Sequence, residues 1–334
     1  MKLRKVFIAL ALSLTLTGCS NPSHFSSSDY IVKQLSFDKP HFNILQMSDI
    51  HFSVLTDLDY HFKFLDLSIN DAIKNCKDKN ENLDLIVLTG DIFMFANEEV
   101  INKTFSFFDN HQIPWTYVFG NHDRQGTHGN TYIEELLNAR IYQNVCFKMF
   151  DDDISGSSNF VIDLNHNNEN VYKLYFFDSH ALMYKEYYGY DYIKKDQIEW
   201  YKWMNKESNL NKVKSSAFFH IPLPEYKEAA KMIELDPSAN IEGGGVHEKV
   251  CSPEYNSGLF SAFKNEGTIS VHCGHDHLNN FEVNYENIKL CYGLKATNLN
   301  THFDNMLGAT LISIKNDYKT VSTKSILHTY SELE

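Results

Sequence analysis

Arginine is scarce in this chain of 334 residues, which contains only Arg4, Arg124 and Arg140. The formal net charge is -13, so carboxylates outnumber the cations. A groove that follows the phosphate backbone of a nucleic acid requires clustered cations, and the composition indicates none. The chain also lacks a CxxC pair, which disfavours a zinc site built from cysteine thiolates.

Linkers rich in proline or serine, and internal repeats, are absent between Phe37 and His328. With 43% hydrophobic residues, the chain can bury a large core. We therefore expect a single globular domain over residues 36–334. The sequence indicates no oligomeric state.

No apolar run is long enough to span a bilayer. The run from Val6 to Leu16 follows a basic N-terminus, as in an export signal, and ends in Leu16-Thr17-Gly18-Cys19. This ending resembles the lipobox of a bacterial lipoprotein, in which Cys19 would be acylated. The alternative is an ordinary secretory signal that happens to contain cysteine.

The lipobox resemblance implies a division of the N-terminal segment. Residues 1–18 would be a lipoprotein signal peptide, and residues 19–35 a lipidated tether. The protein would then be anchored by lipid to the cell membrane or outer membrane, on the exported side. An odd number of cysteines would remain, so at least one would stay free or pair outside the chain. These are Cys76, Cys146, Cys251, Cys273 and Cys291.

The first half of the domain alternates predicted strands and helices. The apolar patterns predict strands at 42–48, 83–89 and from 115, with helices at 58–75 and 100–110. Each strand ends in polar residues. This order is typical of a parallel sheet flanked by helices.

The second half is less regular. Strands are predicted at 171–177, 215–219, 268–273, 288–292, 307–314 and 321–328, and a helix is predicted to start near Asp196. The last three strands alternate with Asn-rich turns, which indicates an antiparallel finish.

The strand that begins at Trp115 ends in Gly120-Asn121-His122-Asp123. Ligands of open α/β folds lie at this carboxyl edge of the sheet. Asn121 offers a neutral oxygen for a cation, His122 can donate a proton near neutral pH, and Asp123 can orient an imidazole. A Gly-Asn pair is also an ordinary turn former, so the motif gains weight only from similar strand ends elsewhere.

Polar side chains of complementary kinds stand at these strand ends. They are Asp49, His51, Asp91, Asn121, His122, His220, His275 and His277. Carboxylates, an amide oxygen and imidazoles without thiolates suit two divalent or trivalent metal ions such as Fe, Mn or Zn. Isolated histidines such as His180 and His272 are better explained as satisfied core or surface residues.

These blocks resemble the signature of the calcineurin-like metallophosphoesterases: Asp49-x-His51, Gly90-Asp91, Gly120 to Asp123, a lone His220, and Gly274-His275-x-His277. Several further segments look like the branch related to purple acid phosphatases. They are 190–193, 197–200, 220–225, 256–260 and 290–293. The resemblance implies an α/β (α+β) fold: a four-layer αββα sandwich of two mixed β-sheets flanked by helices.

Carried over residue by residue, the resemblance assigns two metal positions and a proton donor. The first metal would be held by Asp49, His51 and His277, the second by Asn121, His220 and His275, with Asp91 bridging and His122 as the general acid. One departure is Met94, which occupies the place of the metal-bound Tyr of purple acid phosphatases. Charge-transfer colour is therefore not expected.

The resemblance implies hydrolysis of a phosphate ester by attack of metal-bound hydroxide. Cleavage of phosphodiesters, nucleotides or phosphoproteins by the same family remains open, as does a non-catalytic surface lipoprotein that retains the fold. Arg124 would either hold phosphate or be a solvated surface residue. The aromatic loop 184–192 would either line the substrate pocket or pack on itself.

Overall fold

The computed structural model describes residues 25–334 except 127–128, 140, 151, 184–188 and 242–243. The predicted signal peptide, Cys19 and the start of the tether lie outside the described residues, as does the middle of the aromatic loop.

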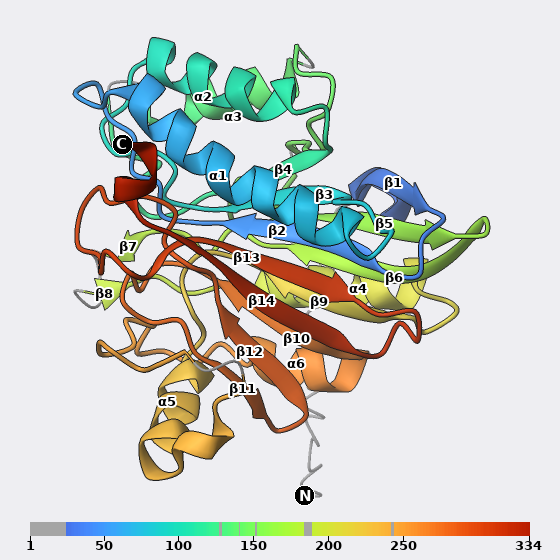
Figure 1. The fold of residues 1–334 in the computed structure, drawn as a ribbon. Helices are drawn as coiled ribbons and strands as arrows, with labels where there is room; N and C mark the ends of the chain where they lie inside the picture. The colour runs from blue at the N-terminus through green and yellow to red at the C-terminus, as the bar shows by residue number, and fades with distance from the viewer. Residues whose placement is uncertain (1–24, 127–128, 140, 151, 184–188, 242–243) are drawn as a thin grey trace, which may run out of the picture.

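Two large sheets pack face to face, with helices on both outer sides (Figure 1). The five-stranded sheet has the order β14 (Val321–His328), β13 (Leu307–Ile314), β2 (Phe42–Met47), β3 (Leu85–Thr89), β4 (Trp115–Val118). The seven-stranded sheet has the order β1 (Ile31–Phe37), β5 (Phe160–His166), β6 (Glu169–Phe176), β9 (Lys214–Phe218), β10 (Thr268–Cys273), β12 (Ile288–Tyr292), β11 (Glu282–Tyr285). Both sheets are mixed, as predicted.

Helices form the outer layers of the sandwich. The five-stranded sheet is covered by α1 (Leu58–Lys77), α2 (Glu98–Asn110) and α3 (Gly129–Asn138). The seven-stranded sheet is covered by α4 (Lys195–Ser208), α5 (Glu225–Leu235) and α6 (Leu259–Glu266). The four-layer αββα sandwich is thereby confirmed. A small hairpin of β7 (Leu182–Met183) and β8 (Gly189–Tyr190) lies beside it.

The predicted strand–helix–strand pattern is confirmed in the first half. β2, β3 and β4 pair in parallel, with Leu45 opposite Ile86 and Leu88 opposite Tyr117. Every residue of these strands is buried, because helices cover one face and the second sheet covers the other. Their carboxyl ends therefore meet at one edge, on the left in Figure 1.

The helix α1 follows from its sequence. Asp57 caps its N-terminus by accepting a hydrogen bond from Tyr60 N at 3.2 Å. Leu65, Ile69 and Ala72, at helical spacing, are fully buried in the core against the sheet. The helix thus connects the parallel strands β2 and β3, as the periodicity predicts.

The antiparallel finish is also confirmed, because β11 pairs antiparallel with β12, and β13 with β14. β12 additionally pairs in parallel with β10. His272 on β10 is fully buried, with its Nε2 3.0 Å from Ser270 Oγ, as its core interpretation predicts. His180 Nε2 lies 2.9 Å from Gln197 Oε1, which gives that imidazole a protein partner.

Three strands of the larger sheet were not predicted: β1, β5 and β11. Charged residues interrupt their apolar pattern. In β5, for example, Asp163 is buried because it pairs with the equally buried Lys173 of β6 at 2.6 Å. A carboxylate inside the sheet is tolerated only with such a partner, which the sequence does not identify.

The predicted boundary at residue 36 lies inside a strand. β1 pairs with β5, and Tyr30 before it is fully buried, with its ring 4.4 Å from that of Phe150. Residues 27–35 therefore belong to the folded domain, and the predicted tether extends too far. Only Leu35, Ser36 and Phe37 of β1 alternate between buried and exposed, and three polar side chains among its seven residues obscured the strand in the sequence.

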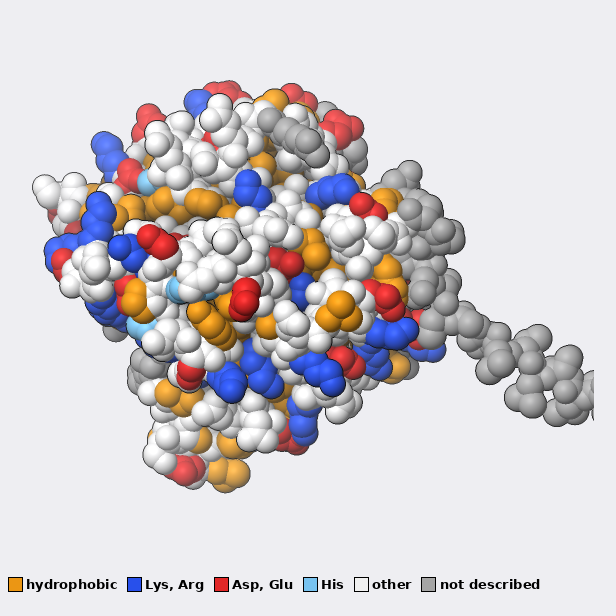
Figure 2. Space-filling model, turned by 90° about the vertical axis from the view of Figure 1, so that its right-hand side faces the viewer, with side chains coloured by type: hydrophobic (Ala, Val, Ile, Leu, Met, Phe, Trp, Pro, Cys, Tyr) orange, Lys and Arg blue, Asp and Glu red, His pale blue; other side chains and the backbone are white. Residues whose placement is uncertain are grey.

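None of the helices in the described residues is long and apolar enough to cross a membrane. No disulfide joins the five cysteines in this part of the chain. Figure 2 shows the end of the molecule away from the carboxyl ends of β2 and β3. Over the coloured residues of this face, lysines alternate with acidic side chains and form no single basic groove.

Candidate metal centre

The candidate ligands follow the carboxyl ends of β2, β3, β4, β9 and β10. Four of these residues have left-handed backbone conformations, with φ of 56° at Asp49, 60° at His51, 50° at Asp91 and 80° at His275. Such conformations are uncommon outside glycine and concentrate at functional sites. The loops after β2 and β3 support each other, because Asp49 N donates to Gly90 O at 3.1 Å and His51 N to Asp91 O at 2.9 Å.

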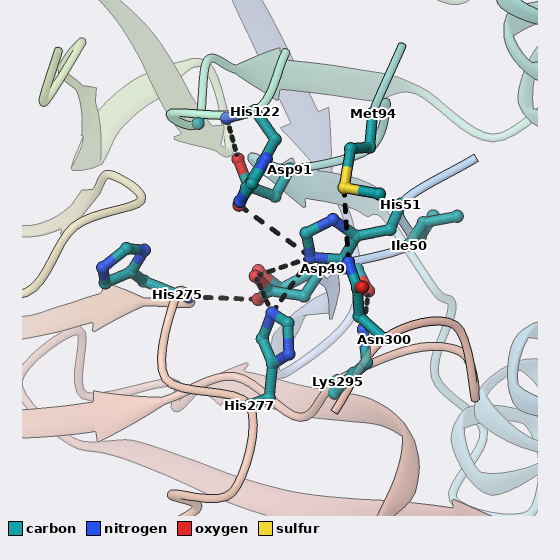
Figure 3. Close-up of polar contacts among 12 residues, drawn as sticks. Asp49, Ile50, His51, Asp91, Met94, His122, His275, His277, Lys295 and Asn300 are labelled. Atoms are coloured by element: carbon teal, nitrogen blue, oxygen red, sulfur yellow. Dashed lines mark hydrogen bonds and ion pairs between the residues drawn. The ribbon is translucent and has the colours of Figure 1, made fainter. Parts of the chain in front are cut away.

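A first group of candidate ligands consists of Asp49, His51 and His277. His277 Nε2 lies 3.4 Å from Asp49 Oδ1 and 2.9 Å from His51 Nε2. His51 Nε2 lies 3.8 Å from Asp49 Oδ1. Figure 3 shows His277, from the loop after β10, directed toward Asp49 and His51, which share the loop after β2. Asp49 and His51 are almost fully buried, so nearby water does not separate them.

A second group consists of Asp91, His220 and His275. His220 Nε2 lies 3.2 Å from Asp91 Oδ2 and 3.2 Å from His275 Nδ1. Asp91 Oδ2 also lies 3.9 Å from His51 Nε2, so this carboxylate stands between the two groups. The structure therefore places six of the candidate residues in two neighbouring groups that Asp91 links.

Backbone carbonyls orient two of the imidazoles. Nδ1 of His220 lies 2.9 Å from Thr89 O, and Nδ1 of His277 lies 2.9 Å from Thr301 O. A proton on each Nδ1 leaves Nε2 free to face the centre, which is how ligating histidines are commonly held.

The donor set fits a metal ion. Within the described residues, the buried atoms Asn121 Oδ1 and His275 Nε2 have no hydrogen-bond partner, although burial without a partner is costly. Carboxylate and amide oxygens together with imidazoles suit borderline cations. A cation coordinated by Asn121 Oδ1 would give that atom a partner, whereas His275 meets His220 through Nδ1, 3.2 Å from His220 Nε2, and not through Nε2.

The electrostatics favour ionised carboxylates and neutral imidazoles at His51 and His275. Burial lowers the pKa of His51 to about 4, although Asp49 opposes this, and burial and His220 lower the pKa of His275 to about 3. Burial also opposes the charge of Asp91, but His220 outweighs it and holds the pKa of this carboxyl well below its usual range. His220 differs, because Asp91 outweighs the effect of burial and raises the pKa of this imidazole to about 10. The site thus presents negative charge and two neutral imidazoles, and a cation bound at His220 would displace a proton.

His122 lies at the rim of this centre. Its Nε2 is 4.0 Å from Asp91 Oδ2, and its side chain is 31% exposed. Its Nδ1 lies 2.9 Å from Gln125 Oε1, which can accept the Nδ1 proton. His122 is also close enough to His51 and Asp91 for the three to form a metal-binding group, so geometry permits a ligand role as well as proton transfer.

Asp123 does not orient an imidazole, contrary to prediction. Its carboxylate accepts hydrogen bonds from the backbone N–H groups of Asp91 and Phe93, both at 2.8 Å, and of Gly120 at 2.7 Å. The loops after β3 and β4 leave these N–H groups without ladder partners, and the buried carboxylate satisfies them. Gln125, which the sequence did not identify, is the residue beside the His122 ring.

Arg124 is neither free nor fully solvated. Its guanidinium donates to the fully buried Asp178, which also accepts from His180 N at 2.8 Å. The pairing holds the Arg124 side chain in one orientation, 29% exposed.

Two aromatic or apolar side chains border the centre. Met94, in the place where tyrosine was expected, accepts a hydrogen bond from Asn300 Nδ2 through its sulfur at 3.4 Å and lies beside His51 in Figure 3. The ring of Tyr190, from the described part of the aromatic loop, meets the His275 ring edge-on at 4.3 Å.

Lys295 is a residue of this region that the sequence analysis missed. It is 2% exposed, and its Nζ donates to the backbone oxygen of Asp49 at 2.6 Å. Burial lowers its pKa to about 8, although the Asp49 and Asp91 carboxylates oppose this. No motif surrounds it in the sequence that indicates its position.

The chain is similar to a known family and to several known proteins. The pattern of the family described as Calcineurin-like phosphoesterase matches residues 42–279. Phosphatase DCR2 of Saccharomyces cerevisiae is 34% identical over 64% of this chain and 40% of its own length. Probable inactive purple acid phosphatase 29 of Arabidopsis thaliana is 34% identical over 64% of this chain and 59% of its own length. The chain therefore spans less than two thirds of these relatives.

A second Arabidopsis thaliana relative, probable inactive purple acid phosphatase 14, is 27% identical over 86% of this chain and 79% of its own length. Among solved structures, the 5'-nucleotidase of Candida albicans has a TM-score of 0.41 and 11% identity, covering 87% of this chain and 52% of that one. The family pattern extends from the first strand of the five-stranded sheet to the residues just after His277. The chain thus belongs to the calcineurin-like phosphoesterase family.

Proposed function

We propose that the protein hydrolyses phosphate esters with two metal ions. Asp49, His51 and His277 would hold the first ion, and Asn121, His220 and His275 the second. Asp91 would bridge them. The observation that carries this proposal is the position of Asp91 Oδ2, which lies within 4 Å of nitrogens from both groups.

Two adjacent cations would activate a water and neutralise charge on the phosphoryl group. The protein supplies the remaining elements. Loops with residues in left-handed backbone conformations hold the ligands in place, and the buried carboxylates supply the compensating negative charge. His122, partly exposed with Nδ1 beside Gln125, would deliver a proton from Nε2 to the leaving-group oxygen.

Arg124 would either bind the non-reacting phosphate oxygens or hold its own loop in place. Its fixed pairing with Asp178 supports an oriented cation near His122, two positions along the chain. A substrate screen distinguishes the hydrolysis of monoesters from that of diesters, including nucleotides and phosphoproteins.

The rival function is binding without turnover. Two plant relatives carry the designation "probable inactive". Loss of activity usually leaves gaps in the ligand set, whereas all eight signature residues are present in this chain. This completeness favours an enzyme.

We also propose that Cys19 carries a lipid that anchors the protein to the cell membrane or outer membrane, on the exported side. The support is the apolar run and the Leu-Thr-Gly-Cys ending alone.

The test is a metal-dependent activity screen. The purified protein is stripped of metal, reloaded separately with Mn, Zn or Fe, and assayed on aryl and alkyl monoesters and diesters. Asp91→Asn should abolish most turnover, whereas Asp163→Asn, the same change at a buried carboxylate outside the centre, should retain it. Metal-loaded protein that hydrolyses none of these esters would support the binding function instead.

A further inference from the structure

Lys295 and Thr297 belong to a segment that passes from one sheet to the other. It follows β12 of the seven-stranded sheet and then pairs with the end of β2, where Ala296 N donates to Ser48 O at 2.9 Å. The backbone oxygen of Lys295 accepts from Gly308 N of β13 at 3.0 Å. The segment is therefore held to β2 and β13 of the five-stranded sheet at Lys295 and Ala296.

The turn beside this segment is Asp49-Ile50-His51. Asp49 and His51 both have left-handed backbone conformations. Such conformations persist only when surrounding contacts determine them. Their N–H groups bond to the loop after β3, but this leaves the turn's carbonyl groups to be held by other partners.

Two side chains of the segment hold those carbonyls. Lys295 Nζ donates to Asp49 O at 2.6 Å, and Thr297 Oγ1 donates to Ile50 O at 2.8 Å. Lys295 is 2% exposed and Thr297 is fully buried, so water cannot replace either donor without rearrangement. Figure 3 shows Lys295 below the turn, on the side of the centre where His277 also lies.

We propose that Lys295 and Thr297 are positioning residues that clamp the Asp49–His51 turn. By holding consecutive carbonyls, they fix the directions in which the Asp49 and His51 side chains leave the backbone. Both side chains belong to the first group of candidate ligands, and Asp49 Oδ2 also accepts a hydrogen bond from the backbone N–H of His275, in the second group, at 3.0 Å. The clamp therefore acts directly on one metal position and only indirectly on the other, and it rests on the proposed metal centre but not on turnover.

Lys295 has two opposite effects on metal binding, one through its charge and one through its hydrogen bond. A buried ammonium repels a nearby cation, so its charge alone would weaken metal binding. Its hydrogen bond goes to a main-chain oxygen and not to a carboxylate. The contact thus orders the turn, and a test must separate this effect from the effect of charge.

Thr297 allows that separation because it is neutral. Thr297→Val removes the hydroxyl and keeps the shape, whereas Thr297→Ser keeps the hydroxyl. The full-length protein is stripped of metal and titrated with Mn²⁺ by calorimetry. In Thr297→Val, one of the two binding steps should weaken by roughly 5- to 30-fold, as expected when a buried carbonyl loses its donor. Thr297→Ser should restore that step, and the other step should weaken much less, because the turn reaches the second group only through the hydrogen bond from His275 N to Asp49.

Lys295→Met extends the test to the second donor, with Lys173→Met as its control. Lys173 is equally buried and paired, but lies outside the centre. Both changes should lower the melting temperature. In the metal-free protein, Lys295→Met should raise the hydrogen-exchange rate of the amides at residues 49–52, whereas Lys173→Met should not. Thr297→Val should raise this rate by a smaller amount.

Two results would overturn the clamp. One is a Thr297→Val protein whose binding steps and exchange at residues 49–52 match the wild type, with or without a lower melting temperature. The other is equal weakening of both binding steps, which would mean that the segment supports the whole centre. A protein without turnover would contradict the proposed function but not the clamp, because metal binding and exchange are measured without substrate.

Discussion

His122→Asn and Asp91→Asn should separate proton delivery from metal binding. Asp91 is 1% exposed, and its Oδ1 accepts from His122 N at 2.7 Å. Asparagine can keep that hydrogen bond, so the substitution mainly removes a charge. Two unit charges 4 Å apart attract by about 4 kcal/mol at an effective dielectric constant of 20. Asp91→Asn should therefore weaken metal binding by roughly a thousandfold and lower activity on every ester.

His122→Asn should leave both metals bound. The His122 side chain is 31% exposed, and its Nδ1 faces Gln125 rather than a candidate ligand. Turnover of an alkyl ester, whose leaving group needs a proton, should fall by roughly 10²- to 10⁴-fold. An activated aryl ester should slow much less, because its leaving group departs without protonation.

The assay combines elemental analysis with rate constants for the two esters. His111→Asn, the same change at a histidine that pairs with Asp66 beyond α2, controls for the substitution itself. If His122→Asn loses metal as Asp91→Asn does, or slows both esters equally, His122 is a ligand or a substrate binder. The short separation of His122, His51 and Asp91 makes this a real test.

Four further predictions follow from the sequence and the fold. Cys19→Ala should abolish labelling by a radioactive fatty acid and release the protein from membranes or trap its precursor; equal labelling of both proteins would contradict the anchor. The metal-loaded protein should lack intense visible absorption because Met94 replaces the expected tyrosine, and a purple preparation would point to another residue such as Tyr190. Burial raises the pKa of Asp84 from 3.8 to about 7, so the free energy of unfolding of the wild type should fall as pH rises through this range. Asp84→Asn should remove that fall. In urea unfolding it should therefore stabilise the protein by at most about 4 kcal/mol at pH 8 and change its stability little at pH 4. Tyr30→Ala should destabilise the domain by about 3 to 5 kcal/mol in the same assay, whereas a residue in a tether would leave stability unchanged.

The sequence by itself determined the strands that carry the first ligands. The runs that became β2, β3 and β4 are mostly apolar, and each is followed by polar residues. Parallel strands joined by helices must bring their carboxyl ends to one edge, so the proximity of Asp49, Asp91 and Asn121 follows from local pattern and chain connectivity. The strand ends of the second half also indicated His220, His275 and His277, and the family resemblance then assigned them to metal positions.

Only the tertiary structure decided the contacts between segments that lie far apart in the chain. Lys295 is 246 residues from the Asp49 carbonyl that it binds. Asp123 was expected to orient an imidazole but accepts hydrogen bonds from three backbone N–H groups instead. Likewise, β1 joined the larger sheet through pairing with β5, although residues 31–35 looked like part of a tether. In each case the partner is a backbone group or a distant strand that carries no local signal, and its need for a hydrogen bond arises only once folding has removed it from water.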